Sequence, residues 1–184
     1  MSAGSAAAEI DGAPYRAVHE VLLAAIDGHV VVAGDSAQVS YFGTAHYWPM
    51  GPGDRFLYPT GFATLGYGLP AAIGAKIAAP DRTAVVLVGD GGFLFTAQEL
   101  VTAAELGINL PVVVMANGGY QESRDEMISR GMTPVGVDLP AVDVGALSRA
   151  CGGQGLRLAD VGQLGDAVRE ALKAPVPTVI ELPV

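Results

Sequence analysis

The sequence is poor in cysteine and has no long apolar run, and each shortage excludes a class of protein. Cys151 is the only cysteine among the 184 residues, so no disulfide can form within the chain and no cluster of thiolates can hold a metal. A single cysteine fits a reducing compartment, and we expect a cytoplasmic location. Apolar stretches such as 84–88 and 112–116 are far too short to cross a bilayer.

Charged residues are also scarce, and those of positive sign are scarcer. They make up 16% of the chain, with 10 Lys and Arg against 19 Asp and Glu, which gives a formal net charge of −9. An acidic surface repels nucleic acid and anionic lipid, so neither is an expected partner. No glycine loop continues into Gly-Lys-Ser or Gly-Lys-Thr, and the glycines at 152–155 lack the context of a dinucleotide site.

Helix-like and strand-like segments alternate along the rest of the chain. This alternation predicts an α/β fold, doubly wound, with a mostly parallel sheet and helices on both faces. We predict a loose N-terminal tail over residues 1–13 and a single domain over 14–184. The predicted helices are 15–26, 70–79, 96–106, 142–151 and 164–172. The predicted strands are 29–33, 84–88, 111–116, 156–158 and 178–182. Residues 37–60 show no clear period and are predicted to form a long loop.

A glycine-rich turn with one carboxylate follows the predicted strand 84–88. It reads Gly89-Asp90-Gly91-Gly92. Glycines let a ligand approach the backbone closely, and amides ahead of a helix attract anions such as phosphate. A carboxylate repels phosphate unless a cation lies between them, and Mg²⁺ commonly bridges carboxylates to phosphate oxygens. The turn therefore predicts a site for magnesium and a phosphate group.

A second turn follows the next predicted strand and reads Asn117-Gly118-Gly119-Tyr120. The 25 residues of 92–116 suffice for one helix and one strand, so the two turns should lie side by side at the carboxyl ends of neighbouring strands. The amide oxygen of Asn117 and the backbone carbonyl of Gly119 could then complete the metal's coordination. Thr96 and Glu99, between the turns, form a capping-box pattern that predicts a helix start.

The spacing of these two turns resembles the signature of enzymes that depend on thiamine diphosphate. That signature is Gly-Asp-Gly, about 25 residues, and then Asn. The resemblance implies that Asp90, Asn117 and the carbonyl of Gly119 hold Mg²⁺. It also implies that the amides of Gly91 and Gly92 contact the diphosphate. The family often has two asparagines in tandem; here alanine takes the first place, and the metal-binding second asparagine is kept.

Residues 60–75 resemble the matching stretch of acetolactate synthases and related 2-oxo acid decarboxylases. The resemblance implies that Leu65 wedges the cofactor into its bent shape. It implies further that the carbonyl of Ala63 accepts a hydrogen bond from the pyrimidine amino group. The loop Ser36-Ala37-Gln38 aligns with one that touches the diphosphate, although its residues differ from the family's.

Some polar and aromatic residues allow two interpretations. Tyr120 either shields the cofactor or simply packs after the turn, and the run 120–139 looks closest to decarboxylases of larger 2-oxo acids, such as the guanidino-oxopentanoate type. Two interpretations are open for four charged residues, which either form a solvated helix face or line the substrate entrance: Arg124, Asp125, Glu126 and Arg130. Loop packing or a substrate-side role would suit His46, Tyr47 and Trp48.

The glutamate that activates the cofactor has no counterpart in this sequence. In the family, a separate pyrimidine-binding domain carries that glutamate, which drives a general-base relay in a dry site. Glu9 and Glu20 do not lie in anything resembling its motif. We therefore expect a split enzyme: a pyrimidine-binding partner chain, in a hetero-oligomer with dimeric copies of each chain, acts with this one on a small 2-oxo acid. The alternatives are an excised C-terminal domain of a longer enzyme and a non-catalytic cofactor-binding or regulatory module.

Overall fold

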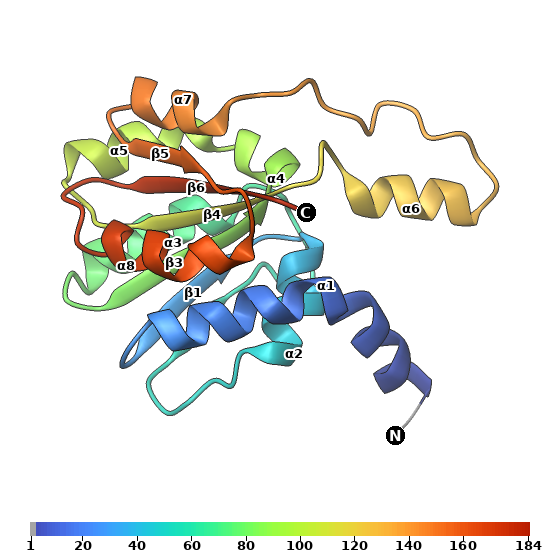
Figure 1. The fold of residues 1–184 in the computed structure, drawn as a ribbon, viewed down its shortest axis with the longest axis horizontal. Coiled ribbons are helices and arrows are strands. Elements are labelled where there is room, and N and C mark those ends of the chain that lie inside the picture. Colours follow the sequence, from blue (N-terminus) through green and yellow to red (C-terminus); the bar gives the residue numbers. More distant parts are fainter. Residues whose placement is uncertain (1–2) are drawn as a thin grey trace.

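Six parallel strands form one sheet in the computed structural model, which describes residues 3–184 and the side chains from Gly12 onward. The sheet order is β2-β1-β3-β4-β6-β5, and every neighbouring pair is parallel. The strands are β1 (Val30–Gly34), β2 (Arg55–Leu57), β3 (Thr83–Gly89), β4 (Pro111–Ala116), β5 (Gln154–Arg157) and β6 (Thr178–Pro183). This arrangement, shown in Figure 1, confirms the predicted α/β fold with a parallel sheet.

Helices cover both faces of the sheet, as a doubly wound fold requires. The α-helices are α1 (Ala3–Ala25), α2 (Ala45–Tyr47), α3 (Gly68–Ala78), α4 (Asp90–Leu94), α5 (Leu100–Glu105), α6 (Gln121–Ser129), α7 (Val144–Ala150) and α8 (Leu164–Ala171). Short helices of other kinds are the π-helix η1 (Val39–Thr44) and the 3-10 helices η2 (Ala97–Glu99) and η3 (Val161–Gln163). Over the part of the chain that is described, no helix is both long and apolar enough for a membrane span.

One hydrophobic cluster lies on each face of the sheet, because successive side chains of a strand point to opposite sides. One cluster joins α1 and α8 to alternate positions of β1, β3, β4 and β6; Val85 and Leu87 belong to it. The other joins α3, α5 and α7 to the intervening positions, which include Val86 and Val88. Both faces are thus buried, which explains why β3 and β4 are apolar throughout.

The prediction that residues 37–60 form a loop is wrong. This segment contains η1, α2 and the edge strand β2, which pairs with β1. Tertiary contacts hold η1 against α1: both ring nitrogens of the fully buried His19 are bonded, one to the backbone oxygen of Tyr15 at 2.7 Å and one to the hydroxyl of Thr44 at 3.0 Å. Such short elements depend on distant partners and leave no periodic signal in the sequence.

Two helix boundaries also differ from the prediction. Helix α1 begins at Ala3 and includes Pro14, so it extends into the segment 1–13 that we predicted as a loose tail; Met1 and Ser2 lie outside the described residues. The predicted helix 96–106 is divided into η2 and α5. The capping box is wrong, because the hydroxyl of Thr96 donates to the carbonyl of Gly66 at 2.9 Å and caps no helix.

We expect opposite effects from alanine at two glycines. Gly74 lies exposed in α3 with open space where a Cβ would be, so Gly74→Ala should raise the free energy of unfolding by about 0.5–1 kcal/mol. A Cβ on Gly43 would lie 2.5 Å from Cε1 of the buried His19, so Gly43→Ala should lower it by about 1–3 kcal/mol. Urea denaturation measures both; equal effects would contradict the packing of η1 on α1.

Candidate functional site

The carboxyl ends of β1, β3 and β4 open onto one cavity of about 260 Å³. In doubly wound sheets, ligands bind at such ends where the strand order reverses, as it does here between β1 and β3. Ten of the eleven predicted cofactor residues line this cavity, namely Ser36, Ala37, Gln38, Ala63, Leu65, Gly91, Gly92, Asn117, Gly119 and Tyr120. The fold therefore gathers residues from four separate stretches of sequence around one space.

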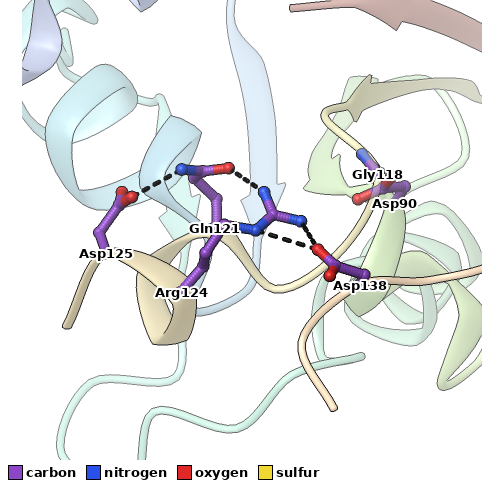
Figure 2. A network of polar contacts seen from close by, with 6 residues as sticks. All are labelled: Asp90, Gly118, Gln121, Arg124, Asp125 and Asp138. Atoms are coloured by element: carbon purple, nitrogen blue, oxygen red, sulfur yellow. Dashed lines mark hydrogen bonds and ion pairs between the residues drawn. The ribbon is translucent and has the colours of Figure 1, made fainter. Parts of the chain in front are cut away.

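Asp90, the eleventh, lies in the first turn and connects it to the second. Its Oδ1 accepts a hydrogen bond from the amide of Gly91 at 2.9 Å, and its Oδ2 accepts one from the amide of Gly118 at 2.8 Å. Figure 2 shows the contact with Gly118. The register that pairs Gly89 with Met115 sets the two turns side by side. Asp90 thus fixes the tip of β4 relative to the tip of β3.

The side chain of Asn117 reaches the same point. In one orientation of its amide, the nitrogen donates to Oδ1 of Asp90 at 3.3 Å and to the carbonyl of Gly119 at 3.1 Å. In the other orientation, the amide oxygen takes that place and three oxygens converge. Adjacent oxygens of a Mg²⁺ octahedron lie about 2.9 Å apart, given metal–oxygen distances of about 2.1 Å. The donor set fits the ion, although among residues 12–184 no three His, Cys, Asp or Glu side chains cluster.

The turn that carries Gly119 is held from behind by a returning segment of chain. The amide of Tyr120 donates to the carbonyl of Val137 at 2.8 Å, and the amide of Leu139 donates to the carbonyl of Gly118 at 2.9 Å. A Cβ on Gly119 would collide with the carbonyl of Val137, and its φ of 151° suits only glycine. The position of the Gly119 carbonyl therefore depends on residues about twenty positions further along the chain.

Helix α6 is fixed to the same returning segment by a polar network. Arg124 forms an ion pair with Asp138 and donates to Oε1 of Gln121 at 2.6 Å. Gln121 in turn donates to Oδ1 of Asp125 at 2.7 Å. Figure 2 shows these side chains in line along α6, with Asp138 approaching from the returning segment. The first turn of α6, which carries Gln121, Glu122 and Ser123, also lines the cavity.

The loop before α3 supplies Ala63 and Leu65 to the cavity. Ala63 adopts a φ of 55°, a conformation that costs energy for any residue with a Cβ. The loop is retained by the amide of Ala63, which donates to the carbonyl of Pro59 at 2.8 Å. It is retained also by the amide of Gly66, which donates to Oδ2 of Asp35 at 3.0 Å. Strained backbone in a cavity wall is typical of a functional site.

Asp35 does not line the cavity but supports the loop that does, and the sequence analysis missed it. It follows β1, is fully buried, and has one carboxylate oxygen without a partner among the described residues. Gly92 packs so closely on this carboxylate that a Cβ there would collide with it. Burial raises the pKa of Asp35 to about 6, although its hydrogen bond from Gly66 opposes the shift. The sequence signal that could have revealed Asp35 was a charged residue directly after an apolar strand.

A second group, whose mutual contacts the sequence did not reveal, forms the outer wall of the cavity. The hydroxyl of Tyr15 donates to Oε1 of Gln38 at 3.0 Å, and Nε2 of Gln38 donates to Glu122 at 3.0 Å and to Asp125 at 3.3 Å. Burial and the charges of Asp125 and Glu122 raise the pKa of Tyr15. Burial, with Glu122 adding to it, raises the pKa of Tyr41.

The remaining candidates take different places. The ring of Tyr120 packs over Gly91 and makes an edge contact with Phe95 at 6.4 Å between ring centroids, so it both packs and lines the cavity. Trp48 is buried in the core beside α1. None of His46, Tyr47 and Trp48 lines the cavity. Cys151 is a free, partly buried cysteine that packs against the core at the end of α7.

Comparison with known families shows which family the chain belongs to. The family model described as "Thiamine pyrophosphate enzyme, C-terminal TPP binding domain" matches residues 30–182. The chain belongs to this family. The resemblance inferred from the two turns is therefore confirmed, and so is thiamine diphosphate as the ligand of the family domain. The match spans all the strand ends that border the cavity.

Enzymes of known class are similar to the chain over nearly its whole length. A probable 2-ketoarginine decarboxylase of Pseudomonas aeruginosa is 41% identical over 175 residues, 92% of this chain and 31% of the relative. An acetolactate synthase of Bacillus subtilis is 32% identical, covering 93% of this chain and 30% of the relative. The structure of a thiamine diphosphate-dependent 4-hydroxybenzoylformate decarboxylase of Rhodococcus jostii superposes with a TM-score of 0.79 at 27% identity, over 95% of this chain and 32% of that one. The chain thus spans about a third of the length of these proteins.

Replacing Asp35 should change how stability depends on pH. Its folded-state pKa of about 6 lies above the ordinary 3.8, so the folded chain retains a proton that the unfolded chain releases between these values. Stability is therefore lost as the pH rises from about 4 to 6. Asp35→Asn does not titrate and should exceed the wild type by about 1–3 kcal/mol at pH 7.5, with little difference near pH 4.

Urea denaturation of both proteins between pH 4 and 8 measures this difference. Asp166→Asn, at a carboxylate whose side chain is 87% exposed, is the control and should follow the wild type at every pH. If the free energy of unfolding of Asp35→Asn varied with pH as that of the wild type does, ionisation of the buried Asp35 would not be what destabilises the fold as the pH rises.

Proposed function

We propose that the chain is the thiamine diphosphate- and Mg²⁺-binding subunit of a split 2-oxo acid decarboxylase or carboligase. The observation that carries this proposal is the convergence of Asp90, Asn117 and the Gly119 carbonyl beside the glycine turn. The membership of the thiamine pyrophosphate family supports the ligand, and the oxygen-only donor set supports Mg²⁺.

Each part of the cavity has a role in this proposal. Asp90, Asn117 and the Gly119 carbonyl hold the metal, and the amides of Gly91 and Gly92 at the start of α4 bind the diphosphate. The loop Ser36-Ala37-Gln38 borders the diphosphate on its other side. Leu65 supports the bent cofactor, the carbonyl of Ala63 accepts from its pyrimidine amino group, and Tyr120 shields it. When bound, thiamine diphosphate supplies the nucleophilic carbon that attacks a 2-oxo group.

The activating glutamate comes from another domain in this proposal. The chain spans about a third of its relatives, which supports the need for further domains without fixing whether they lie on a partner chain. A pyrimidine-binding chain that forms a hetero-oligomer with this one, in dimeric copies of each, is the arrangement that we propose. A longer protein of which this is the C-terminal domain would supply the same group in the same way. The single cysteine favours the cytoplasm for either.

A non-catalytic cofactor-binding or regulatory module is the second candidate. Exposed apolar side chains near the cavity, among them Phe62 at 90% and Phe95 at 55% exposure, favour assembly with another domain whichever candidate holds. The two candidates differ in product formation: the enzyme converts 2-oxo acids once the pyrimidine-binding domain is present, whereas the module binds the cofactor without turnover. The names of the relatives in turn support a 2-oxo acid as the substrate.

Asp90→Ala should abolish Mg²⁺-dependent binding of thiamine diphosphate. Loss of a carboxylate ligand should weaken cofactor affinity by about a hundredfold or more, because the metal that links protein and diphosphate is no longer held. Isothermal titration of the chain with its pyrimidine-binding domain, with and without Mg²⁺, measures the effect. Asp166→Ala is the control, and circular dichroism checks the fold. Cofactor affinity unchanged in Asp90→Ala would contradict the metal assignment.

Turnover should require both the chain and the pyrimidine-binding domain. Carbon dioxide release from a panel of 2-oxo acids, measured for the chain alone and with that domain, tests the split arrangement. Enzyme-like rates from the chain alone would overturn the need for a partner. Tight cofactor binding by the assembly without any conversion would favour the non-catalytic module.

A further inference from the structure

A second cavity, of about 160 Å³, lies on the other side of the two glycine turns. In the first turn, Gly91 lines the cavity described above, whereas Asp90 lines the second one. In the second turn, Asn117 and Gly118 divide between the two cavities in the same way. The two turns therefore form a common wall between the first and the second cavity.

The second cavity is mostly apolar and contains one ion pair. Arg157 of β5 and Glu181 of β6 supply the charges, and Nη1 of Arg157 lies 3.1 Å from Oε1 of Glu181. An engineered cavity of about 150 Å³ holds benzene, so a molecule of about six to eight non-hydrogen atoms fits a space of this size. The apolar part of the lining comes from α4, α7 and the segment before α7: Leu94, Leu139, Pro140, Ala141, Val142 and Val144.

Glu181 places a charge where the sheet otherwise has core residues. Alternate residues of a strand face the same side, so Glu181 faces the same side as Val179, which belongs to the hydrophobic cluster beneath α3, α5 and α7. Its side chain is only 7% exposed, whereas that of Arg157 is 68% exposed. Within the described part of the chain, its carboxylate has no other cation or hydrogen-bond donor. Oε2 of Glu181 is therefore left for a ligand.

A purely structural role does not explain this carboxylate. The backbones of β5 and β6 already pair at this level, with Arg157 in register with Glu181. An ion pair with one exposed partner adds little to such a pairing. Burying a carboxylate is costly, and an apolar residue at the same position would avoid that cost. A buried charge in the wall of a cavity instead suits the recognition of a polar group.

The arrangement of the two charges indicates which polar group fits. A ligand with only a carboxylate would be repelled by Glu181, and a ligand with only an ammonium group would be repelled by Arg157. A molecule that carries both charges on one carbon satisfies both residues: its ammonium donates to Oε2 of Glu181, and its carboxylate accepts from Arg157. The apolar residues of the lining then cover an apolar side chain.

We propose that the second cavity binds an α-amino acid with a small apolar side chain, and that this ligand strengthens cofactor binding on the other side of the common wall. The inference goes beyond the proposed function, because it names a second ligand for a different cavity. The ligand restrains the turn that carries Gly119 by packing against the segment 139–142.

Two hydrogen bonds connect this segment to the wall. The amide of Leu139 donates to the carbonyl of Gly118 at 2.9 Å, and the amide of Gly118 donates to Oδ2 of Asp90 at 2.8 Å. Figure 2 shows Gly118 beside Asp90. A ligand that holds Leu139 in place thus also holds Gly118 against Asp90. Because coupling between two sites is reciprocal, the cofactor should strengthen amino acid binding by the same factor.

The first test compares three small molecules that share one apolar body. The probe is L-norvaline; pentanoate is norvaline without its ammonium group, and butylamine is norvaline without its carboxylate. Isothermal titration is performed on the assembly of this chain with its pyrimidine-binding domain, without cofactor. We expect norvaline to bind about tenfold or more tightly than either analogue, because only norvaline pairs with both charges.

Three variants make the result specific to the second cavity. Glu181→Gln and Arg157→Gln should each weaken norvaline binding by about tenfold, and Glu181→Gln should not weaken the binding of pentanoate. Arg157 is exposed, so its replacement leaves the core intact. Glu170→Gln is the control: it neutralises a carboxylate of α8 that is paired with Lys173, on the other face of the sheet, and should keep the wild-type affinity. Thermal unfolding shows that each variant is folded.

The second test measures the coupling between the cavities. Saturating norvaline should raise the affinity of the assembly for thiamine diphosphate and Mg²⁺ by about fivefold, and this gain should vanish in Glu181→Gln. The same titrations with the order of addition reversed give the effect of the cofactor on norvaline. Equal factors in both directions support one coupled system.

The outcomes separate this inference from the proposed function. Norvaline that binds no more tightly than its analogues, or as tightly to Glu181→Gln as to the wild type, overturns the amino acid site. Norvaline that binds there without changing cofactor affinity overturns the coupling. An assembly that binds norvaline but not thiamine diphosphate overturns the proposed function and the coupling, and leaves the amino acid site standing.

Discussion

The parallel register of β3 and β4 is the constraint on which the site depends. It pairs Gly89 with Met115, so the chain leaves both strands at the same level and Asp90 meets Asn117. A slip of one residue would move the second turn by about 3.3 Å and reverse which side chains face each core. That slip would force the side chains of β4 to repack in both cores, which close packing opposes. Asp90 then adds two hydrogen bonds that fix the turns themselves, so packing sets the site coarsely and the carboxylate sets it finely.

Asp35 holds another part of the cavity wall in place, the loop before α3 that carries Ala63 and Leu65. Its carboxylate binds the amide of Gly66 and lies against Gly92, so the loop that carries Leu65 is positioned relative to the turn after β3. A buried carboxylate is an expensive way to join two segments, since an apolar contact would avoid desolvation. The backbone of Gly92 approaches the Asp35 carboxylate more closely than a residue with a Cβ could. Glycine at position 92 is required for the same reason.

The sequence predicted the parts of this structure that rest on local pattern. Strand β4 was predicted to the residue, because a strand buried on both faces is apolar from end to end, and the two turns follow from glycines and a carboxylate placed directly after such strands. The segment 37–60 was missed, since η1 and β2 owe their conformation to His19 and to β1, which lie far away in sequence. Gln38 was predicted through a family loop, but its contacts with Glu122 and Asp125 span more than eighty positions. No local pattern encodes such a contact.

Helix α6 connects the turn that carries Asn117 and Gly119 to the outer wall of the cavity. It has no buried residue, and Figure 1 shows it and the segment that follows extending away from the sheet. A helix of nine residues is not stable alone, so its polar contacts must hold it: Arg124 with Asp138 on one side, and Gln38 with the two carboxylates on the other. The first of these contacts also braces the strand-like pairing that positions the Gly119 carbonyl. The outer wall of the cavity and the turn that carries Gly119 are therefore coupled through one short helix.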